Sequence, residues 1–231
     1  MQKHFGRKNI PHHKLIRHFH EIFERQYYTE SGPLVESLEE YLSTRFGFKN
    51  VVCISNASIC WLMLIDCVLS GRCFVSHENM SRPLMEAVNW FKAPFLSNLK
   101  GPHHNLLSGR QSHRDKVVVL PAEIPLPRLE SHFNNIEDAN QQTILDTKYL
   151  DSSLKAGNSN FFEFGVISFD PIDHNLGLGA FIHTDDDRLA DKLRCMRSSG
   201  GVRKIVPVKR TVNGRMSEAQ AAFVITLFDL Y

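Results

Sequence analysis

The chain has 231 residues, of which 42% are hydrophobic and 23% charged, as is typical of a globular protein and not of a disordered one. Its formal net charge of +2 is too balanced to indicate a nucleic-acid partner. The five cysteines are odd in number and lack CxxC spacing, so we expect neither a disulfide framework nor a zinc site. The adjacent histidines His12-His13 and His103-His104 lack further ligands at metal-binding spacing, so we expect no metal.

The hydropathy pattern also excludes a membrane partner. No apolar run reaches the roughly 18 residues that a membrane span needs. The start of the chain, residues 1–14, is polar and basic without an apolar segment, and so is not a signal peptide. We therefore expect a cytoplasmic location.

Two amphipathic helices open the predicted fold. Apolar residues recur at helical spacing over 15–28 and again over 34–46, and Gly47 supplies a C-terminal cap for the second helix. Packing against a core explains both apolar faces without any functional role.

A short buried strand, Val51–Ile54, then leads through Ser55-Asn56-Ala57-Ser58 into a helix predicted over Ile59–Leu69. A strand, a turn of small residues and a helix N-terminus form a ready anion site, because free N–H groups and the helix dipole face the ligand. An N-cap by Ser55, Asn56 or Ser58 accounts for the same residues without a ligand. Both interpretations stay open on sequence alone.

Strand and helix signals alternate along the rest of the chain, which favours an α/β fold. We expect strands over 73–75, 117–120, 143–146, 161–167 and 180–183, an exposed loop over 97–114, and helices over 187–197 and 217–230. The predicted fold class is a three-layer sandwich with a mainly parallel central sheet. Ligands bind at the carboxyl ends of strands in such sheets, and Ser55, Asp146 and Ser168 all fall at predicted ends.

The segment between the last two predicted strands is rich in polar and turn residues. It reads Ser168-Phe169-Asp170-Pro171-Ile172-Asp173-His174-Asn175-Leu176-Gly177-Leu178-Gly179. Its glycines mark positions where the backbone can approach a ligand closely. The spacing by itself fits either a loop that faces a ligand or a plain surface turn.

This loop resembles the cofactor loop of the DegT/DnrJ/EryC1/StrS family of nucleotide-sugar aminotransferases, fold-type-I pyridoxal-phosphate enzymes whose loop runs Ser-Phe-x-x-x-Lys and then Gly-Glu-Gly-Gly. Ser168 and Phe169 match, but the position of the Schiff-base lysine is held by Asp173. A carboxylate has no amine to condense with the cofactor aldehyde, so we predict a protein that cannot transaminate by the usual route.

The resemblance covers about residues 19–231 and implies an aspartate aminotransferase-like large domain over 29–231, after an N-terminal segment and helix over 1–28. The family's smaller C-terminal domain is expected to be absent. Residues 212–222 are close to the family's Asn-x-Arg-Met-Ser-x-x-Gln-Ala-Ala motif, in which Asn213 binds the phosphate of the neighbouring subunit's cofactor. This implies a dimer, although Ser217 also suits a helix N-cap.

The resemblance assigns further residues to the cofactor. Asp146 corresponds to the carboxylate that pairs with the pyridinium nitrogen, although a helix cap by the same residue was equally consistent with the pattern. Met80 lies near the position of the family's stacking aromatic residue. The complete set of expected cofactor-binding residues is Ala57, Ser58, Met80, Asp146, Tyr149, Ser168 and Asn213.

Three functional hypotheses follow. The first is an inactive aminotransferase-like protein of nucleotide-sugar or polysaccharide biosynthesis that holds pyridoxal or pyridoxamine phosphate non-covalently. The second is a sugar 3-dehydrase, whose family loop Ser-Phe-x-Pro-x-His-His suggests His174 as the base, with Asp173 in place of the first histidine. The third is a non-catalytic subunit that forms a homodimer or a heterodimer with an active family member. The basic pairs Arg203-Lys204 and Lys209-Arg210 fit either a solvated loop or contact with a sugar-nucleotide phosphate.

Overall fold

The computed structural model describes residues 11–28, 32–70, 72–76, 80–97, 116–121, 142–147, 164–169, 177–198 and 210–228. For residues 73, 75–76, 95–97, 116–121, 142–147 and 228 the description covers the backbone alone. The helices are α1 (His12–Arg25), α2 (Pro33–Phe46), α3 (Ala57–Leu64), the π-helix η1 (Ile65–Leu69), α4 (Arg82–Trp90), α6 (Asp187–Arg197) and α7 (Glu218–Phe228). The strands are β1 (Asn50–Ile54), β2 (Cys73–Ser76), β3 (Phe95–Ser97), β4 (Lys116–Pro121), β5 (Gln142–Thr147), β6 (Phe164–Ser168) and β7 (Ala180–Thr184).

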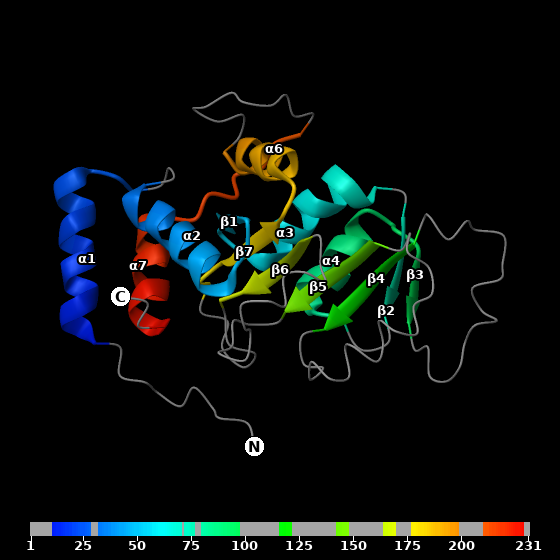
Figure 1. The fold of residues 1–231 in the computed structure, drawn as a ribbon, viewed down its shortest axis with the longest axis horizontal. Coiled ribbons are helices and arrows are strands. Elements are labelled where there is room, and N and C mark those ends of the chain that lie inside the picture. The colour runs from blue at the N-terminus through cyan, green and yellow to red at the C-terminus, as the bar shows by residue number, and fades with distance from the viewer. Residues whose placement is uncertain are drawn as a thin grey trace, which may run out of the picture.

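Within this part of the chain, all the strands join one sheet in the order β1-β7-β6-β5-β4-β2-β3. β7 is antiparallel to both of its neighbours, and every other pair in the sheet is parallel. The expectation of a mainly parallel sheet in an α/β fold is therefore confirmed. Figure 1 shows α1, α2 and α7 grouped at the β1 end of the sheet, with β3 at the other end.

The strands β1, β6 and β7 are buried on both faces. Val51 and Cys53 of β1 face a core cluster formed with α2 and α7, whereas Val52 and Ile54 face a second cluster formed with α3, α4 and α6. This alternation follows from the two-residue repeat of a strand. It also explains why these strands read as continuous apolar runs, a pattern typical of strands that are covered on both faces.

The helices with strong local signals lie where the sequence predicts them. α2 ends at Phe46, and Gly47 adopts the left-handed conformation of a C-cap at φ 72°. α6 has the predicted bounds of residues 187–197. The helix predicted to end at residue 69 changes from α to π geometry at Ile65.

Two predictions at the ends of the fold were incomplete. Of the apolar face predicted for α1, Ile22 is buried and Leu15 and Phe19 pack on the core, but Ile16 and Phe23 are exposed. The helix also ends before Tyr27, because Gln26 turns left-handed at φ 55°. α4, whose first turn is capped by the Ser81 hydroxyl, and β3 were not predicted. In the described part of the chain, no helix combines the length and apolar character that a membrane crossing requires.

Candidate functional site

The candidate site lies at one edge of the sheet. Since β1, β5 and β6 all run in the same direction, their carboxyl ends meet there. Ile54 and Ser168 flank Ala180 across β7, and the backbone of Asp146 pairs with Val166, two residues before Ser168. The expectation that Ser55, Asp146 and Ser168 share this edge is confirmed for the backbone.

The turn after β1 ends in a capped helix. Of the three cap candidates, Asn56 is the N-cap: its Oδ1 accepts a hydrogen bond from the Ile59 N–H at 2.9 Å. Ser55 donates its N–H to the Gly214 carbonyl at 2.9 Å. The amides of Ala57 and Ser58 lie in the first turn, where a helix offers no carbonyl of its own. The helix end therefore keeps donors for an anion.

The Ser58 side chain already has a polar neighbour. Its hydroxyl lies 3.4 Å from Glu86 Oε2, and Arg82 pairs with the other oxygen of that carboxylate at 2.8 Å. Because Arg82 offsets the charge of Glu86, the contact does not leave a lone negative charge beside the helix end. Such exposed pairs contribute little to stability and can rearrange around a ligand.

The glycines after Leu176 adopt left-handed backbone. Gly177 has φ 68° and Gly179 has φ 98°. A Cβ on Gly179 would lie 2.5 Å from Met216 Cε and 2.7 Å from the Ile54 carbonyl oxygen. The close approach that the sequence suggested for a ligand is thus, at Gly179, an approach to the chain's own β1. Phe169 donates its N–H to the Gly179 carbonyl at 2.9 Å, which holds the two sides of the loop together.

Residues 212–216 lie beside the Ser55 turn, which they contact through the Gly214 carbonyl. Val212 and Gly214 donate their N–H groups to the Met196 and Arg197 carbonyls, each at 2.9 Å, so the segment is held against the end of α6. Asn213 is exposed, and its Oδ1 accepts from Arg215 Nε at 3.2 Å. Exposure of Asn213 leaves its amide open to a neighbouring molecule.

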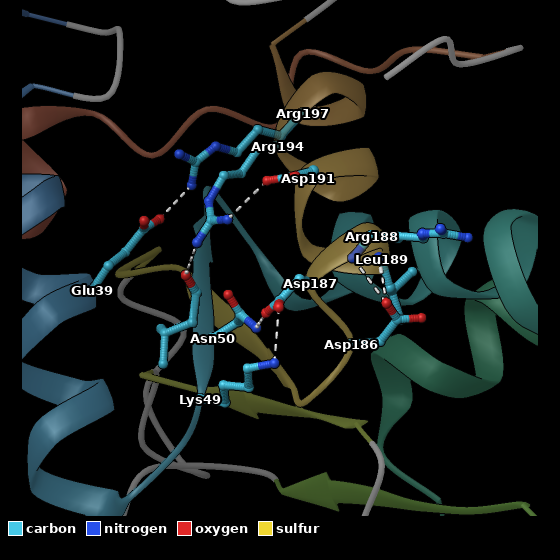
Figure 2. Close-up of polar contacts among 11 residues, drawn as sticks. Glu39, Lys49, Asn50, Asp186, Asp187, Arg188, Leu189, Asp191, Arg194 and Arg197 are labelled. Carbon is cyan, nitrogen blue, oxygen red and sulfur yellow. Dashed lines mark hydrogen bonds and ion pairs between the residues drawn. The ribbon is translucent and has the colours of Figure 1, made fainter. Parts of the chain in front are cut away.

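A buried ion pair between Arg197 and Glu39 bonds to the backbone of β1. Arg197 Nη1 donates to Glu39 Oε1 at 2.5 Å and to the Cys53 carbonyl at 2.6 Å, and the same carboxylate oxygen accepts from the Cys53 N–H at 2.8 Å. Figure 2 shows Arg197 and Arg194 projecting from α6 toward β1 and α2. Burial raises the pKa of the Cys53 thiol well above its usual value, so this cysteine is not a nucleophile.

Sequence reasoning missed the residue that links the two loops of the site. Gln220 Nε2 donates to the Ser55 carbonyl at 3.1 Å and to the Gly177 carbonyl at 2.7 Å. Its Oε1 accepts from the Ser217 N–H at 3.0 Å, in the pattern of a capping box. The spacing Ser-x-x-Gln before an apolar helix indicates a capping box, but it does not indicate that Gln220 also bonds Ser55 and Gly177.

The structure describes some of the remaining predicted residues and leaves others outside its described range. Met80 is buried and belongs to the second cluster, which includes residues of α3 and α4. Of the two predicted basic pairs, Arg210 is described, and it forms an exposed ion pair with Asp66 at 2.8 Å. Asp146 is described by its backbone alone, and Tyr149, Asp173 and His174 lie outside the described residues.

Comparison by sequence finds a family match over part of the chain. Residues 136–229 match the model of the DegT/DnrJ/EryC1/StrS aminotransferase family. The resemblance inferred from the motifs is therefore confirmed. No curated protein matches the chain in sequence.

Solved structures match over nearly the whole chain. DesI, crystallised with its TDP-sugar product, is 20% identical with a TM-score of 0.71, and the match covers 96% of this chain and 59% of DesI. A DegT DnrJ EryC1 StrS aminotransferase from Brucella abortus is 18% identical with a TM-score of 0.70, covering 96% and 65%. A GDP-4-keto-6-deoxymannose-3-dehydratase is 16% identical with a TM-score of 0.71, covering 94% and 65%. These likenesses establish a shared fold, and the chain spans less than two thirds of each structure.

Proposed function

We propose that this chain is a non-transaminating relative of the nucleotide-sugar aminotransferases that binds pyridoxal phosphate or pyridoxamine phosphate without a covalent link. The observation that carries the proposal is the convergence of the carboxyl ends of β1, β5 and β6 beside the N-terminus of α3. The family match over 136–229 and the fold shared with sugar-modifying enzymes support this cofactor class.

The described residues fit the phosphate of such a cofactor. The first-turn amides of Ala57 and Ser58 and the positive end of the α3 dipole attract an anion, and the side chains at this turn are small. When bound, the cofactor supplies an electron sink. We assign Asp146, at the same edge, to the ring nitrogen, and Ser168 and Tyr149 to further contacts. We assign apolar packing to Met80, which is buried in the second cluster.

The residue at position 173 decides the chemistry. Without an amine there, the chain has no group at the expected place to capture the aldehyde, and Asp173 can at most accept or hold a proton. Binding then depends on the phosphate and ring contacts alone. We expect both cofactor forms to bind reversibly.

Absorbance spectroscopy tests this function. We expect the purified full chain to take up pyridoxamine phosphate. Pyridoxal phosphate should wash out after borohydride treatment as pyridoxine phosphate, because borohydride reduces the free aldehyde to an alcohol and finds no imine to a protein amine. The variant Asp173→Lys should retain the borohydride-treated cofactor. A cofactor that stays on the wild-type protein after borohydride would overturn the proposal, and so would failure to bind either form.

A 3-dehydrase is the second candidate, favoured by the shared fold with a GDP-4-keto-6-deoxymannose-3-dehydratase and by His174 in the loop. Under this hypothesis His174 is the base that transfers a proton in the reaction, a role that suits an imidazole near neutral pH. The variant His174→Asn should abolish any dehydration of 4-keto sugar nucleotides while it leaves pyridoxamine phosphate binding unchanged. Absence of dehydration by the wild type would remove this candidate, and dehydration by the variant at the wild-type rate would remove the role of His174.

A third candidate is a subunit that completes the site of a second molecule. The exposure of Asn213 supports it, because a residue that reaches a neighbour's phosphate has to be at the surface. Sedimentation should then give a homodimer, or a heterodimer when an active family member is added. A monomer under both conditions would exclude this role.

We also infer that residues 29–231 form one three-layer domain preceded by a segment over 1–28. Helices that pack on both faces of β1, β6 and β7 support the layers. Limited proteolysis should leave one resistant core over 29–231, on which α1 stays packed through Phe19 and Ile22. Cleavage that separates the two core clusters would contradict a single domain.

A further inference from the structure

We propose that Gln220 is a positioning residue that holds the Ser55–Ser58 turn and the Gly177–Gly179 segment at a fixed separation. In this way it sets the width of the cofactor site. The consequence for cofactor binding depends on the proposed function, whereas the mechanical link between the two segments does not.

The hydrogen bonds of the Gln220 amide determine its orientation. Its NH2 group faces the carbonyls of Ser55 and Gly177 at 3.1 and 2.7 Å, which can only accept. Its oxygen faces the backbone N–H of Ser217 at 3.0 Å, which can only donate. In the flipped amide the oxygen would face two carbonyl oxygens and the NH2 group would face an N–H, so the neighbours allow one orientation.

The base of this link is rigid. α7 packs on α1 and α2, and its Ala221, Ala222 and Val224 are fully buried next to Gln220. The Ser217 hydroxyl accepts from the Gln220 N–H at 3.1 Å and thereby fixes the first turn of the helix. A side chain anchored on such a turn allows little relative motion between the groups that it binds.

The Gln220 contact holds Gly177, next to the buried Leu178 and the Phe169–Gly179 hydrogen bond. Gly177 is exposed, has φ 68°, and has no atom within 4 Å of the position where a Cβ would stand. Glycine loses more backbone freedom on ordering than other residues, so an exposed glycine needs a specific bond to stay in place. Among the contacts described, the Gln220 amide gives it that bond.

The two segments adjoin different sequence elements assigned to the proposed site. Ser55 opens the turn that presents the α3 amides, and Gly177 follows the segment that carries Asp173. One side chain therefore sets the position of the phosphate-binding turn relative to the loop that would carry the chemistry. Loss of this link should weaken binding without removing any group that touches the cofactor.

Two substitutions separate the link from the helix cap. In Gln220→Glu the carboxylate still serves the capping box, but it replaces two N–H donors with acceptors that face two carbonyls. In Ser217→Ala the cap hydroxyl is lost and the Gln220 donors remain. Gln220→Met, which has a similar length and no donor, serves if the charge in Gln220→Glu prevents folding.

Hydrogen exchange and cofactor titration read out the difference. In full-length Gln220→Glu we expect amide exchange to accelerate about tenfold or more in peptides over 53–60 and 164–180, and the Kd for pyridoxamine phosphate to rise by a similar factor. Ser217→Ala should accelerate exchange only at the start of α7 and change the Kd less than about twofold.

Each outcome decides a different claim. Unchanged exchange in both segments of Gln220→Glu and Gln220→Met overturns the inference. Faster exchange with an unchanged Kd overturns the role of Gln220 in setting the site. If wild type binds neither cofactor form, the proposed function fails, and the exchange data alone still decide whether Gln220 links the two segments.

Discussion

The carboxylate of Glu218, at the start of α7, caps the N-terminus of α2 by accepting a hydrogen bond from the Leu34 N–H at 2.9 Å. It also accepts from the Val35 N–H at 3.1 Å, so two first-turn donors of α2 are satisfied by one side chain from another helix. A Cβ on Gly32 would lie 2.6 Å from the Glu218 carboxyl carbon, which explains the glycine before Pro33.

Removal of this cap should destabilise the fold. Glu218→Ala leaves two buried N–H groups without partners, and we expect it to lower the free energy of unfolding by about 2 kcal/mol. Urea unfolding followed by circular dichroism measures the loss. The matched control is Glu36→Ala on the exposed face of α2, which should change stability by less than about 0.5 kcal/mol.

Glu218 also gives a pH dependence of defined sign. Burial raises the pKa of its carboxyl, although the two backbone N–H groups partly oppose that shift. The folded state therefore keeps this proton to a higher pH than the unfolded state, and protonation favours folding. The stability of wild type relative to Glu218→Gln should rise as the pH falls through the raised pKa. A constant difference across that range would show that Glu218 does not titrate as expected.

His183 produces the opposite dependence. Its ring stacks on Phe48 with centroids 4.2 Å apart, it is fully buried, and burial lowers the pKa of the imidazole from 6.5 to about 3. The unfolded chain takes up this proton below pH 6.5 and the folded chain does not, so acid destabilises the fold. The cost reaches about 2 kcal/mol at pH 5.

A substitution by phenylalanine tests this dependence. His183→Phe keeps the ring stack and removes the titrating group, so its acid unfolding midpoint should lie below that of wild type. The control His20→Gln changes an exposed histidine of α1 and should leave the midpoint in place. Equal midpoints for wild type and His183→Phe would mean that other groups govern acid unfolding.

Local signals in the sequence account for most of the fold. Gly47 as a cap, the apolar runs of β1 and β6, and the Asp186 cap of α6 all depend on neighbours a few residues away. The rule that parallel strands share a carboxyl edge then brought Ser55 and Ser168 together. α1 was harder to predict, because helical spacing does not distinguish the face that packs on α7 from the face left exposed.

The contacts that brace the site could not be predicted in this way. Gln220 and Ser55 are 165 positions apart, Glu218 and Leu34 are 184 apart, and Arg197 and Glu39 are 158 apart. No periodicity links residues at such separations, and each pair is polar, so the hydrophobic pattern carries no information about it. Only the assembled fold shows that these side chains meet.

The Arg197–Glu39 pair should have a large effect on stability. Both side chains are buried, at 5% and 14% exposure, and both also bond the Cys53 backbone. Arg197→Met strands the Glu39 carboxylate in the interior, so we expect a loss of about 3 kcal/mol. Chemical denaturation of the single and double variants measures it.

A double-mutant cycle distinguishes pairing from packing. Arg197→Met with Glu39→Gln should lose less than the sum of the single losses, because the second change removes the stranded charge. The control Arg194→Met breaks a half-exposed pair with Asp191 and should cost less than about 1 kcal/mol. Additive losses at Arg197 and Glu39 would show that the two side chains act independently.

Gly179 should tolerate no side chain. In Gly179→Ala the new Cβ meets the Ile54 carbonyl oxygen at 2.7 Å and Met216 Cε at 2.5 Å, and the residue must keep a left-handed φ of 98°. Conformational strain and overpacking together should cost roughly 4 kcal/mol. Thermal unfolding of the variant measures this loss.

The neighbouring glycine provides the matched control, since Gly177 is also left-handed but has open space around it. Gly177→Ala should therefore cost only the strain, about 1 kcal/mol. Met216→Ala should restore part of the stability of Gly179→Ala, because a side chain can be cut back whereas the Ile54 carbonyl cannot move out of β1 without breaking its pairing with β7. Equal costs at the two glycines would show that Gly179 does not lie against β1 as described.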